Sequence, residues 1–288
     1  MADAPEPTTE PAAFTVVAPA NPARFVFASP HSGRHYPADM AAAAGLEAPS
    51  LRSAEDALVD RLIAPGLERG AALLLGGWGR AYVDLNRDPE DLDPVLIDGL
   101  EGRTASPRTA AGYGVLPRLT GDGRPLYDRR LGLEEVRDRL RRVHAPYHAA
   151  LGELLQAART GHGEAVLVDW HSMPSRATRG SGGARGPDVV LGDRHGSSCS
   201  ADLTRRLRKA FEALGWRVAL NQPYSGGWTT QIWGRPADGF HAVQIELNRA
   251  LYLDEATLEP GPGWSRCARG VSRVIDDLLS GPSGFTRT

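Results

Sequence analysis

The sequence AVLVDWHSM, residues 165–173, decides the fold that we expect for this chain. It opens with an unbroken apolar run, which is typical of a strand buried on both faces of a largely parallel sheet. Polar side chains, from Asp169 to Ser172, follow where the strand ends. Open α/β sheets bind their ligands at the carboxyl ends of strands, so we take His171 as the anchor of a candidate active site.

Other segments repeat this pattern of a short apolar strand followed by polar side chains. Residues 23–29 precede His31, and residues 241–247 lead through Glu246 to Arg249. Further strands are expected over residues 71–75, 81–85, 188–191 and 216–220, and helices over 51–70, 131–159, 200–215 and 264–279. Strands that alternate with helices predict an α/β fold, a three-layer αβα domain with a mixed, largely parallel central sheet.

The helix expected over residues 51–70 begins with candidate ligands. Ser53 would cap this helix, and Glu55 and Asp56 fall in its first turn, where the helix dipole favours carboxylates. That dipole effect explains both acids without a site. The alternative is that one of them reaches a metal ion held by His31.

The helix expected over residues 131–159 contains a proline, Pro146, which should kink it or split it in two. His144 and His148 lie four residues apart, a spacing that can bind metal. The usual catalytic glutamate beside the first histidine is absent, since Ala145 stands there. We therefore interpret the pair as packing or surface histidines.

Composition excludes several classes of function. The 288 residues carry a formal net charge of −2, which gives no electrostatic reason to expect a nucleic acid or an anionic membrane as partner. The two cysteines, Cys199 and Cys267, are far apart and predict neither a disulfide framework nor a thiolate metal cluster. No run approaches the roughly 18 apolar residues of a membrane span, so we expect a cytoplasmic protein. Its oligomeric state has no signature in the sequence.

The domain organisation is expected to be simple. Residues 1–22 are acidic and proline-rich and lack the apolar core of a signal peptide, which predicts a disordered leader. Residues 23–288 would form one α/β domain. Within it, residues 88–130 are rich in Gly, Pro, Asp and Arg and predict a long loop insertion, a substrate lid or a partly mobile segment.

The polar residues at the strand ends form a plausible metal site. Two imidazoles and one carboxylate are the ligand set of many catalytic zinc sites, which leave one position for water. His31, His171 and either Glu55 or Asp56 offer that set. Together they indicate a metal-dependent hydrolase.

The same segments offer the other groups that such an enzyme needs. Glu246 is a further carboxylate that is not needed as a metal ligand. It could act as general base on the water and as general acid to the leaving nitrogen. Arg87 and Arg249 offer bidentate recognition of a substrate carboxylate. The sequence contains no nucleophile elbow and no HExxH motif, which argues against serine hydrolases and classical zincins.

Several motifs, taken together and in this order, resemble the N-formylglutamate amidohydrolase family. They are PHSG (30–33), Asp56 before VDRL (59–62), AYVDLNR (81–87), DWHS (169–172) and ELNR (246–249) with Leu251 and Tyr252, and they span roughly residues 24–255. The resemblance implies a zinc-exopeptidase-like fold of the phosphorylase/hydrolase type, related to carboxypeptidases and muramoyl amidases. It also implies hydrolysis of N-formyl-L-glutamate to formate and glutamate, late in histidine breakdown.

The resemblance also assigns roles to the metal site. It implies that His31, Asp56 and His171 bind one Zn²⁺ per chain, although other divalent metals fit the same ligands. Asp56 is preferred to Glu55 because of its spacing to VDRL. Glu246 would be the catalytic base.

Substrate recognition follows from the resemblance less directly. Asn86 and Arg87, or Arg249, would hold substrate carboxylates, and Tyr224 would shape the pocket. Family members often carry an arginine after the Gly-Gly turn, where this chain has Gln231. An amidase or carboxypeptidase-like hydrolase of another N-acyl amino acid or peptide is therefore the alternative, and a non-catalytic binding protein on the same scaffold is a second one.

Overall fold

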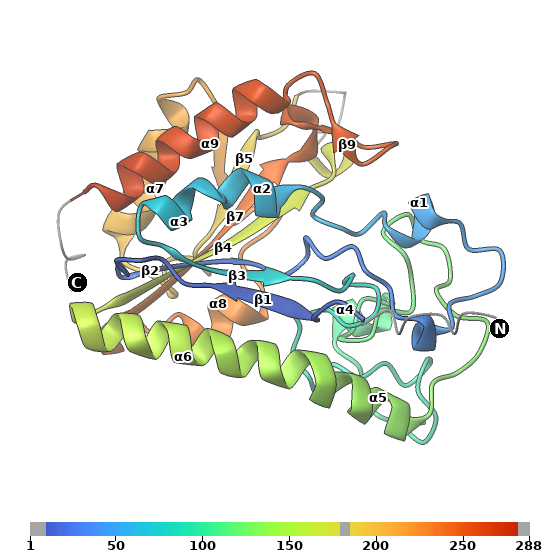
Figure 1. Cartoon of the computed structure of the whole chain (residues 1–288). Coiled ribbons are helices and arrows are strands. Elements are labelled where there is room, and N and C mark those ends of the chain that lie inside the picture. Colours follow the sequence, from blue (N-terminus) through green and yellow to red (C-terminus); the bar gives the residue numbers. More distant parts are fainter. Residues whose placement is uncertain (1–9, 179–184, 282–288) are drawn as a thin grey trace, which may run out of the picture.

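The computed structural model describes residues 10–178 and 185–281, and a seven-stranded sheet runs through its centre (Figure 1). The strand order is β1-β3-β2-β4-β7-β5-β6. The strands are β1 Phe14–Val17, β2 Phe25–Ser29, β3 Ala72–Gly76, β4 Ala165–Met173, β5 Val189–Gly192, β6 Val218–Leu220 and β7 Phe240–Asn248. A separate two-stranded sheet pairs β8 Leu253–Asp254 with β9 Glu259–Pro260.

The sheet is mixed but largely parallel, as predicted. The four central strands β3, β2, β4 and β7 run parallel to one another. β1 joins this group antiparallel to β3, and β5 joins it antiparallel to β7 while pairing parallel with β6. The carboxyl ends of the central strands therefore lie at one edge of the sheet.

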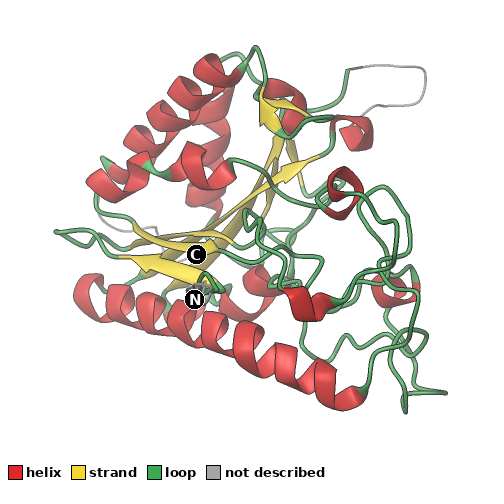
Figure 2. Cartoon of the chain, turned by 45° about the vertical axis from the view of Figure 1, so that its right-hand side comes forward, coloured by secondary structure: helices red, strands yellow, loops and turns green. Residues whose placement is uncertain are grey.

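Helices cover both faces of the sheet, which confirms the predicted three-layer α/β architecture (Figures 1 and 2). The helices are α1 Ala48–Leu51, α2 Val59–Ile63, α3 Pro65–Glu68, α4 Pro107–Ala110, α5 Leu133–Arg139, α6 Ala145–His162, α7 Ala201–Glu212, α8 Trp228–Trp233 and α9 Trp264–Leu279. Single 3₁₀ turns occur at Ala38–Met40, Ser175–Thr178, Pro236–Asp238 and Arg249–Leu251. In Figure 1, α2, α3, α7 and α9 lie on one side of the sheet, and α6 and α8 lie on the other. Within the two described ranges, no helix is long and apolar enough to cross a membrane.

Strand β4 shows why the sheet has a core on each face. All nine of its residues are buried, as the apolar run predicts. Val166, Val168 and Trp170 pack in the core that contains α2, α7 and α9, whereas Ala165 and Leu167 pack in the core that contains α6. Because side chains alternate across a strand, the next residues on the α6 side are Asp169 and His171.

The prediction of a disordered leader over residues 1–22 is wrong for its last part. Phe14–Val17 form β1, an edge strand that pairs with Ala72–Gly76 of β3. The sequence FTVV is β-branched and aromatic, and it satisfies the main chain of β3 that would otherwise be exposed. Residues 1–9 lie outside the described range.

The long helix expected over residues 51–70 is also wrong. The chain forms the three short helices α1, α2 and α3 instead, and residues 52–58 form turns. Ser53 caps no helix, and Asp56 precedes α2. Its amide donates a 2.9 Å hydrogen bond to the carbonyl of His31, and Leu58 adopts a left-handed φ of 65°. A tertiary main-chain contact therefore prevails over the local helical pattern.

Residues 81–85 do not form the strand that we expected there. They form turns, and the amide of Asp84 donates to the carbonyl of Val115 in the segment 88–130 (2.8 Å). That segment contains α4 and otherwise runs as turns and loops. The main-chain contact fixes residues 84–87 against the loop and not in the sheet.

The helix expected over residues 131–159 continues past Pro146 without splitting (Figure 1). A π-helical turn, Leu140–His144, joins α5 to α6, and the amide of Ala145 donates to the carbonyl of Leu140. Proline has no amide proton to donate one turn back. The wider turn next to Pro146 absorbs this missing bond, and single π turns of this kind are common inside α-helices.

Candidate active site

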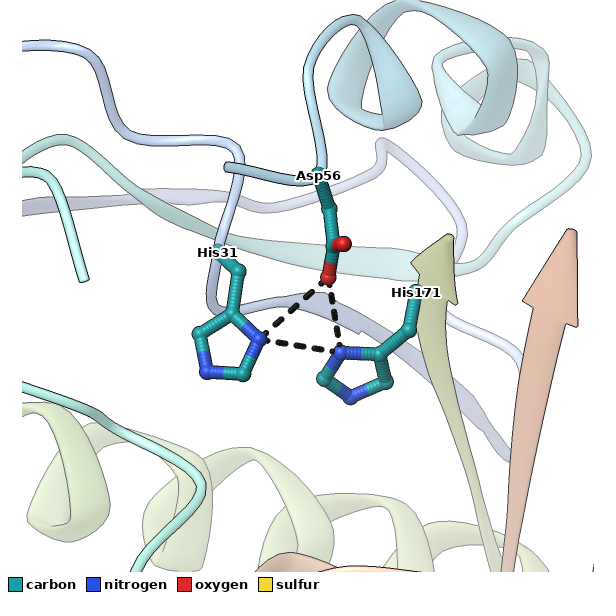
Figure 3. A group of neighbouring side chains, drawn as sticks. All are labelled: His31, Asp56 and His171. Carbon is teal, nitrogen blue, oxygen red and sulfur yellow. Dashed lines mark hydrogen bonds and ion pairs between the residues drawn. The ribbon is translucent and has the colours of Figure 1, made fainter. Parts of the chain in front are cut away.

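Three side chains from distant parts of the sequence converge at the carboxyl edge of the sheet (Figure 3). Nδ1 of His171 lies 3.1 Å from Nδ1 of His31 and 3.0 Å from Oδ2 of Asp56. Nδ1 of His31 lies 3.3 Å from the same oxygen. All three residues are buried, and their ligand atoms lie close enough together to hold one metal ion.

Local structure positions each of these residues. His31 follows the end of β2, and His171 lies near the end of the neighbouring strand β4. Asp56 is held beside them by the amide-to-carbonyl bond to His31 and by the Ser32 hydroxyl, which donates to its carbonyl (3.3 Å). The same hydroxyl accepts from the amide of Asp60, at the start of α2.

Two further aspartates orient the histidines. The Nε2 atom of His31 lies 2.7 Å from Oδ1 of Asp84, and Nε2 of His171 lies 3.0 Å from Oδ2 of Asp169. A carboxylate accepts hydrogen bonds, so each Nε2 carries a proton, and in the neutral imidazole each Nδ1 then presents a lone pair towards Asp56. Carboxylate–histidine pairs of this kind fix the tautomer and ring orientation of metal ligands.

The electrostatics of the three-residue group favour a positive charge at its centre. Burial alone would lower the pKa of His171, but Asp169 and Asp56 outweigh it and hold that pKa well above its usual range. Burial likewise opposes ionisation of Asp56, whereas its contacts with His171 and His31 hold its pKa well below its usual range. Two lone pairs and a carboxylate that face one another are therefore a site for a cation.

Glu246 lies beside this group because β4 and β7 pair in register. His171 is opposite Glu246, and Asp169 is opposite Gln244. The Nε2 group of Gln244 donates a 2.7 Å hydrogen bond to Oε1 of Glu246. Burial raises the pKa of Glu246 to about 7, although the positive charge of His171 opposes the shift. A carboxyl group with such a pKa can both accept and donate a proton near neutral pH.

Asn86 connects Asp169 to the main chain of α8. Its Nδ2 group donates to Oδ2 of Asp169 (3.1 Å) and its Oδ1 accepts from the amide of Thr229 (2.9 Å). We refer to His31, Asp56 and His171 as the metal group.

His144 and His148 hold the main chain on either side of Asn86. Nε2 of His144 donates to the carbonyl of Arg87 and Nε2 of His148 donates to the carbonyl of Leu85, each at 2.9 Å. The two histidines are packing residues that hold this main chain, as we predicted for them.

All eight residues predicted from the sequence for the site line one cavity of about 380 Å³. They are His31, Asp56, Asn86, Arg87, His171, Tyr224, Glu246 and Arg249. The structure turns Asp56, and not Glu55, towards the histidines. Glu55 is buried elsewhere, where it accepts from the Tyr36 hydroxyl (2.7 Å) and from Arg52.

The family model described as N-formylglutamate amidohydrolase matches residues 23–253. The chain belongs to the N-formylglutamate amidohydrolase family. A protein from Pseudomonas aeruginosa named N-formylglutamate deformylase is 34% identical over 215 residues, which are 74% of this chain and 75% of that protein. A protein of the same name from Pseudomonas putida is 32% identical over 213 residues, 73% of this chain and 74% of its own length.

Solved structures agree with this membership. The crystal structure of N-formylglutamate amidohydrolase from Ralstonia eutropha superposes with a TM-score of 0.87 at 34% identity, over 93% of this chain and 97% of that one. A gene product of Agrobacterium tumefaciens shares the fold at a TM-score of 0.63 and 20% identity, over 94% and 96% of the two chains. The fold of this chain is therefore that of the amidohydrolase family.

Two arginines of the amidohydrolase cavity are already engaged with protein groups. Arg249 donates to the Ser172 hydroxyl (3.0 Å), to the Ser53 carbonyl (3.2 Å) and to Oδ1 of Asp56 (3.3 Å). Arg80 donates to Oδ2 of Asp84 at 2.6 Å. Both bring positive charge to the carboxylates that surround the candidate metal group.

Sequence reasoning missed several residues of the site: Arg80, Asp84, Asp169 and Gln244. Asp169 and Gln244 had a detectable signal, because each lies two positions before a predicted site residue and shares its face of the strand. Asp84 stands in the same relation to Asn86 outside the sheet. Arg80 lies in a turn, and no motif or spacing in the sequence indicates that it belongs to the site.

Proposed function

We propose that this protein hydrolyses the formamide bond of N-formyl-L-glutamate, giving formate and L-glutamate, with one Zn²⁺ ion held by His31, Asp56 and His171. Its substrate is thus a small amide that carries carboxylates, and the resemblance places the reaction in histidine breakdown. The observation that carries the proposal is the buried His-Asp-His group with Glu246 beside it in one cavity. The family membership supports the choice of substrate.

Zinc is the proposed metal because two nitrogens and one carboxylate oxygen are a common set in catalytic zinc sites, which keep an open position. The donor set fits, since both Nδ1 atoms present lone pairs to the oxygen of Asp56. When bound, such an ion polarises a carbonyl and acidifies water. Asp84 and Asp169 hold the two imidazoles in the tautomer that binding requires.

Glu246 is the proposed proton carrier. As a carboxylate it accepts the proton of the attacking water, and as the acid it delivers that proton to the nitrogen of glutamate as the C–N bond breaks. A pKa of about 7 suits both steps, because acceptance and release are then nearly balanced. The hydrogen bond from Gln244 holds one oxygen, which leaves the other for the reaction.

Charged and polar groups around the cavity orient the substrate. We propose that Arg87 and Asn86 bind a substrate carboxylate and that Tyr224, which lines the same cavity, shapes the pocket. Arg249 contributes positive charge to the cavity, while its nitrogens hold Ser172 and Asp56 in place. An ion pair with an arginine fixes the position of a carboxylate more strictly than a lysine would.

Formate release from N-formyl-L-glutamate tests the proposal, with zinc-loaded protein and chelator-treated protein side by side. We expect release that the chelator abolishes and that added zinc restores. Glu246→Gln should retain zinc and lose most turnover, because the glutamine oxygen still accepts from Gln244 but the amide can neither take up nor release a proton near neutral pH. His171→Ala should lose zinc. Zinc-containing protein that releases no formate would reject this substrate and direct the search to other N-acyl amino acids and peptides.

A further inference from the structure

The cavity of the metal group continues past Arg87 into a second cavity of about 490 Å³. The residues Asn86, Arg87, Arg108 and Ser225–Gly227 line both cavities. The second one is bounded further by Arg194, Trp228 and Gln231. A ligand whose amide lies at the metal group can therefore extend past Arg87 towards a part of the cavity that the proposed reaction does not use.

Arg87, at the junction, shares its carboxylate partner, Asp84, with Arg80. It donates to the carbonyls of Tyr113 (3.1 Å) and Asn86 (3.0 Å), which are neutral. The nearest carboxylate oxygen, Oδ2 of Asp84, is 3.9 Å away and already accepts from Arg80. Burial lowers the pKa of Arg87, an effect that Asp84 and Asp91 oppose and that repulsion from Arg80 and Arg108 strengthens. The junction therefore holds a largely buried positive charge whose ion pair, at 3.9 Å, is with a carboxylate that a second arginine also binds.

Arg108 and Arg194 add positive charge to the second cavity. Arg108 lies in α4, inside the segment 88–130, and Arg194 follows β5, so they reach the cavity from separate elements. Within residues 10–178 and 185–281, neither guanidinium makes a hydrogen bond or an ion pair. Asp88 and Asp91 also line this cavity, yet no ion pair joins either of them to these arginines in the same part of the chain.

We propose that Arg108 and Arg194 bind the second carboxylate of the substrate, beyond the carboxylate that is assigned to Arg87. This inference rests on the proposed function and assigns the residues that distinguish an acidic side chain of the substrate from a neutral one. Among the described residues, Arg108 and Arg194 line one cavity and form no ion pair with either of its two aspartates, so they are free to bind a carboxylate, which arginine binds with paired hydrogen bonds. Gln231 in α8 lines the same cavity as a neutral residue, so the charge for this carboxylate comes from α4 and from the loop after β5.

The comparison of N-formyl-L-glutamate with N-formyl-L-glutamine tests this assignment, because the two differ only in the charge of the side chain. We expect the wild type to prefer the glutamate compound in kcat/KM. Arg108→Gln and Arg194→Gln should each reduce kcat/KM for the glutamate compound roughly tenfold, through KM, and leave the glutamine compound unchanged. Arg124→Gln is the matched control, since Arg124 is exposed in the same loop segment and lines neither cavity.

Two outcomes would overturn the assignment. One is an equal loss for both substrates, which would mean that the arginines do not contact the side chain. The other is an unchanged preference for glutamate in the Arg108→Gln and Arg194→Gln proteins and in the double variant. Thermal unfolding of each variant shows whether it is folded.

Binding measurements separate this inference from the proposed function. Calorimetric titration with glutarate, a dicarboxylate, and with butyrate, its monocarboxylate counterpart, needs no turnover. If no formate is released but glutarate binds and both variants weaken its binding alone, the reaction is rejected and the carboxylate site is supported. If glutarate binds wild type and variants equally, or binds no better than butyrate, the carboxylate site is rejected whatever the enzyme hydrolyses.

Discussion

Replacement of Asp169 by asparagine should weaken metal binding without disturbing the fold. Oδ2 of Asp169 accepts from Nε2 of His171 (3.0 Å) and from Nδ2 of Asn86 (3.1 Å). Both donors point at the same oxygen, so an asparagine there keeps its carbonyl oxygen in that position. Oδ1 has no hydrogen-bond partner among the described residues, so the new NH₂ group displaces none. The change removes a charge and little else.

The expected size of the effect follows from that charge. The carboxylate makes His171 a stronger base, and hence a stronger ligand, and it holds the pKa of His171 high against the effect of burial. Loss of an outer carboxylate partner of a metal-bound histidine costs roughly 10- to 100-fold in metal affinity. This corresponds to about 1.4–2.8 kcal/mol of binding free energy. Stability of the metal-free protein should change less.

Competition for zinc with a chromophoric chelator measures the affinity, and thermal unfolding in excess chelator measures the stability of the metal-free protein. Asp193→Asn is the matched control. Asp193 is also buried and hydrogen-bonded, by Thr204 and Asn221, but lies outside the cavity. It should leave zinc affinity within about twofold of wild type. A folded Asp169→Asn protein with wild-type zinc affinity would refute the argument that this carboxylate sets the basicity of His171.

Three further predictions concern the scaffold. His148→Phe should lower the free energy of unfolding by about 1–3 kcal/mol, because the carbonyl of Leu85 loses its buried donor; an unchanged urea midpoint would contradict this. Burial raises the pKa of Cys199 and of Cys267 to about 12, so a thiol reagent at pH 8 should modify neither in the native state and both in urea. Fast reaction of the native protein would show that the thiols are accessible. Leu151→Ala in α6 should cost about 2–5 kcal/mol, and a loss below 1 kcal/mol in urea unfolding would mean that this core is not tightly packed.

The parts of the structure that could be predicted are those in which burial alone decides the conformation. The apolar run of β4 has no polar face, so it had to lie inside the sheet, and its polar end had to lie at the sheet edge. The alternation of side chains along a strand could also have predicted two further site residues. Asp169 shares a face with His171, and Gln244 shares one with Glu246, so a strict use of the two-residue period would have added both to the site.

The parts that could not be predicted depend on contacts between distant segments. Residues 52–58 have a helical apolar pattern, but the bond from the Asp56 amide to the His31 carbonyl holds them in turns. That bond exists only once β2 is in the sheet. Likewise, several helices and strands lie between Arg108 and Arg194 along the chain. These two arginines line one cavity only after the chain has folded. Spacing along the chain carries no trace of such contacts.

The site divides into a rigid part and a variable part, and this division has a consequence for specificity. His171 and Glu246 lie opposite each other on β4 and β7, whose residues are all buried, so their spacing is fixed by the hydrogen bonds of the sheet. Arg108 and Arg194 lie in a short helix and a loop outside the sheet. Substitutions at these two positions can therefore change which side chain is accepted while the metal group and the proton carrier stay in place. Chemistry that is set by a sheet and recognition that is set by loops allow one scaffold to hydrolyse different N-acyl amino acids.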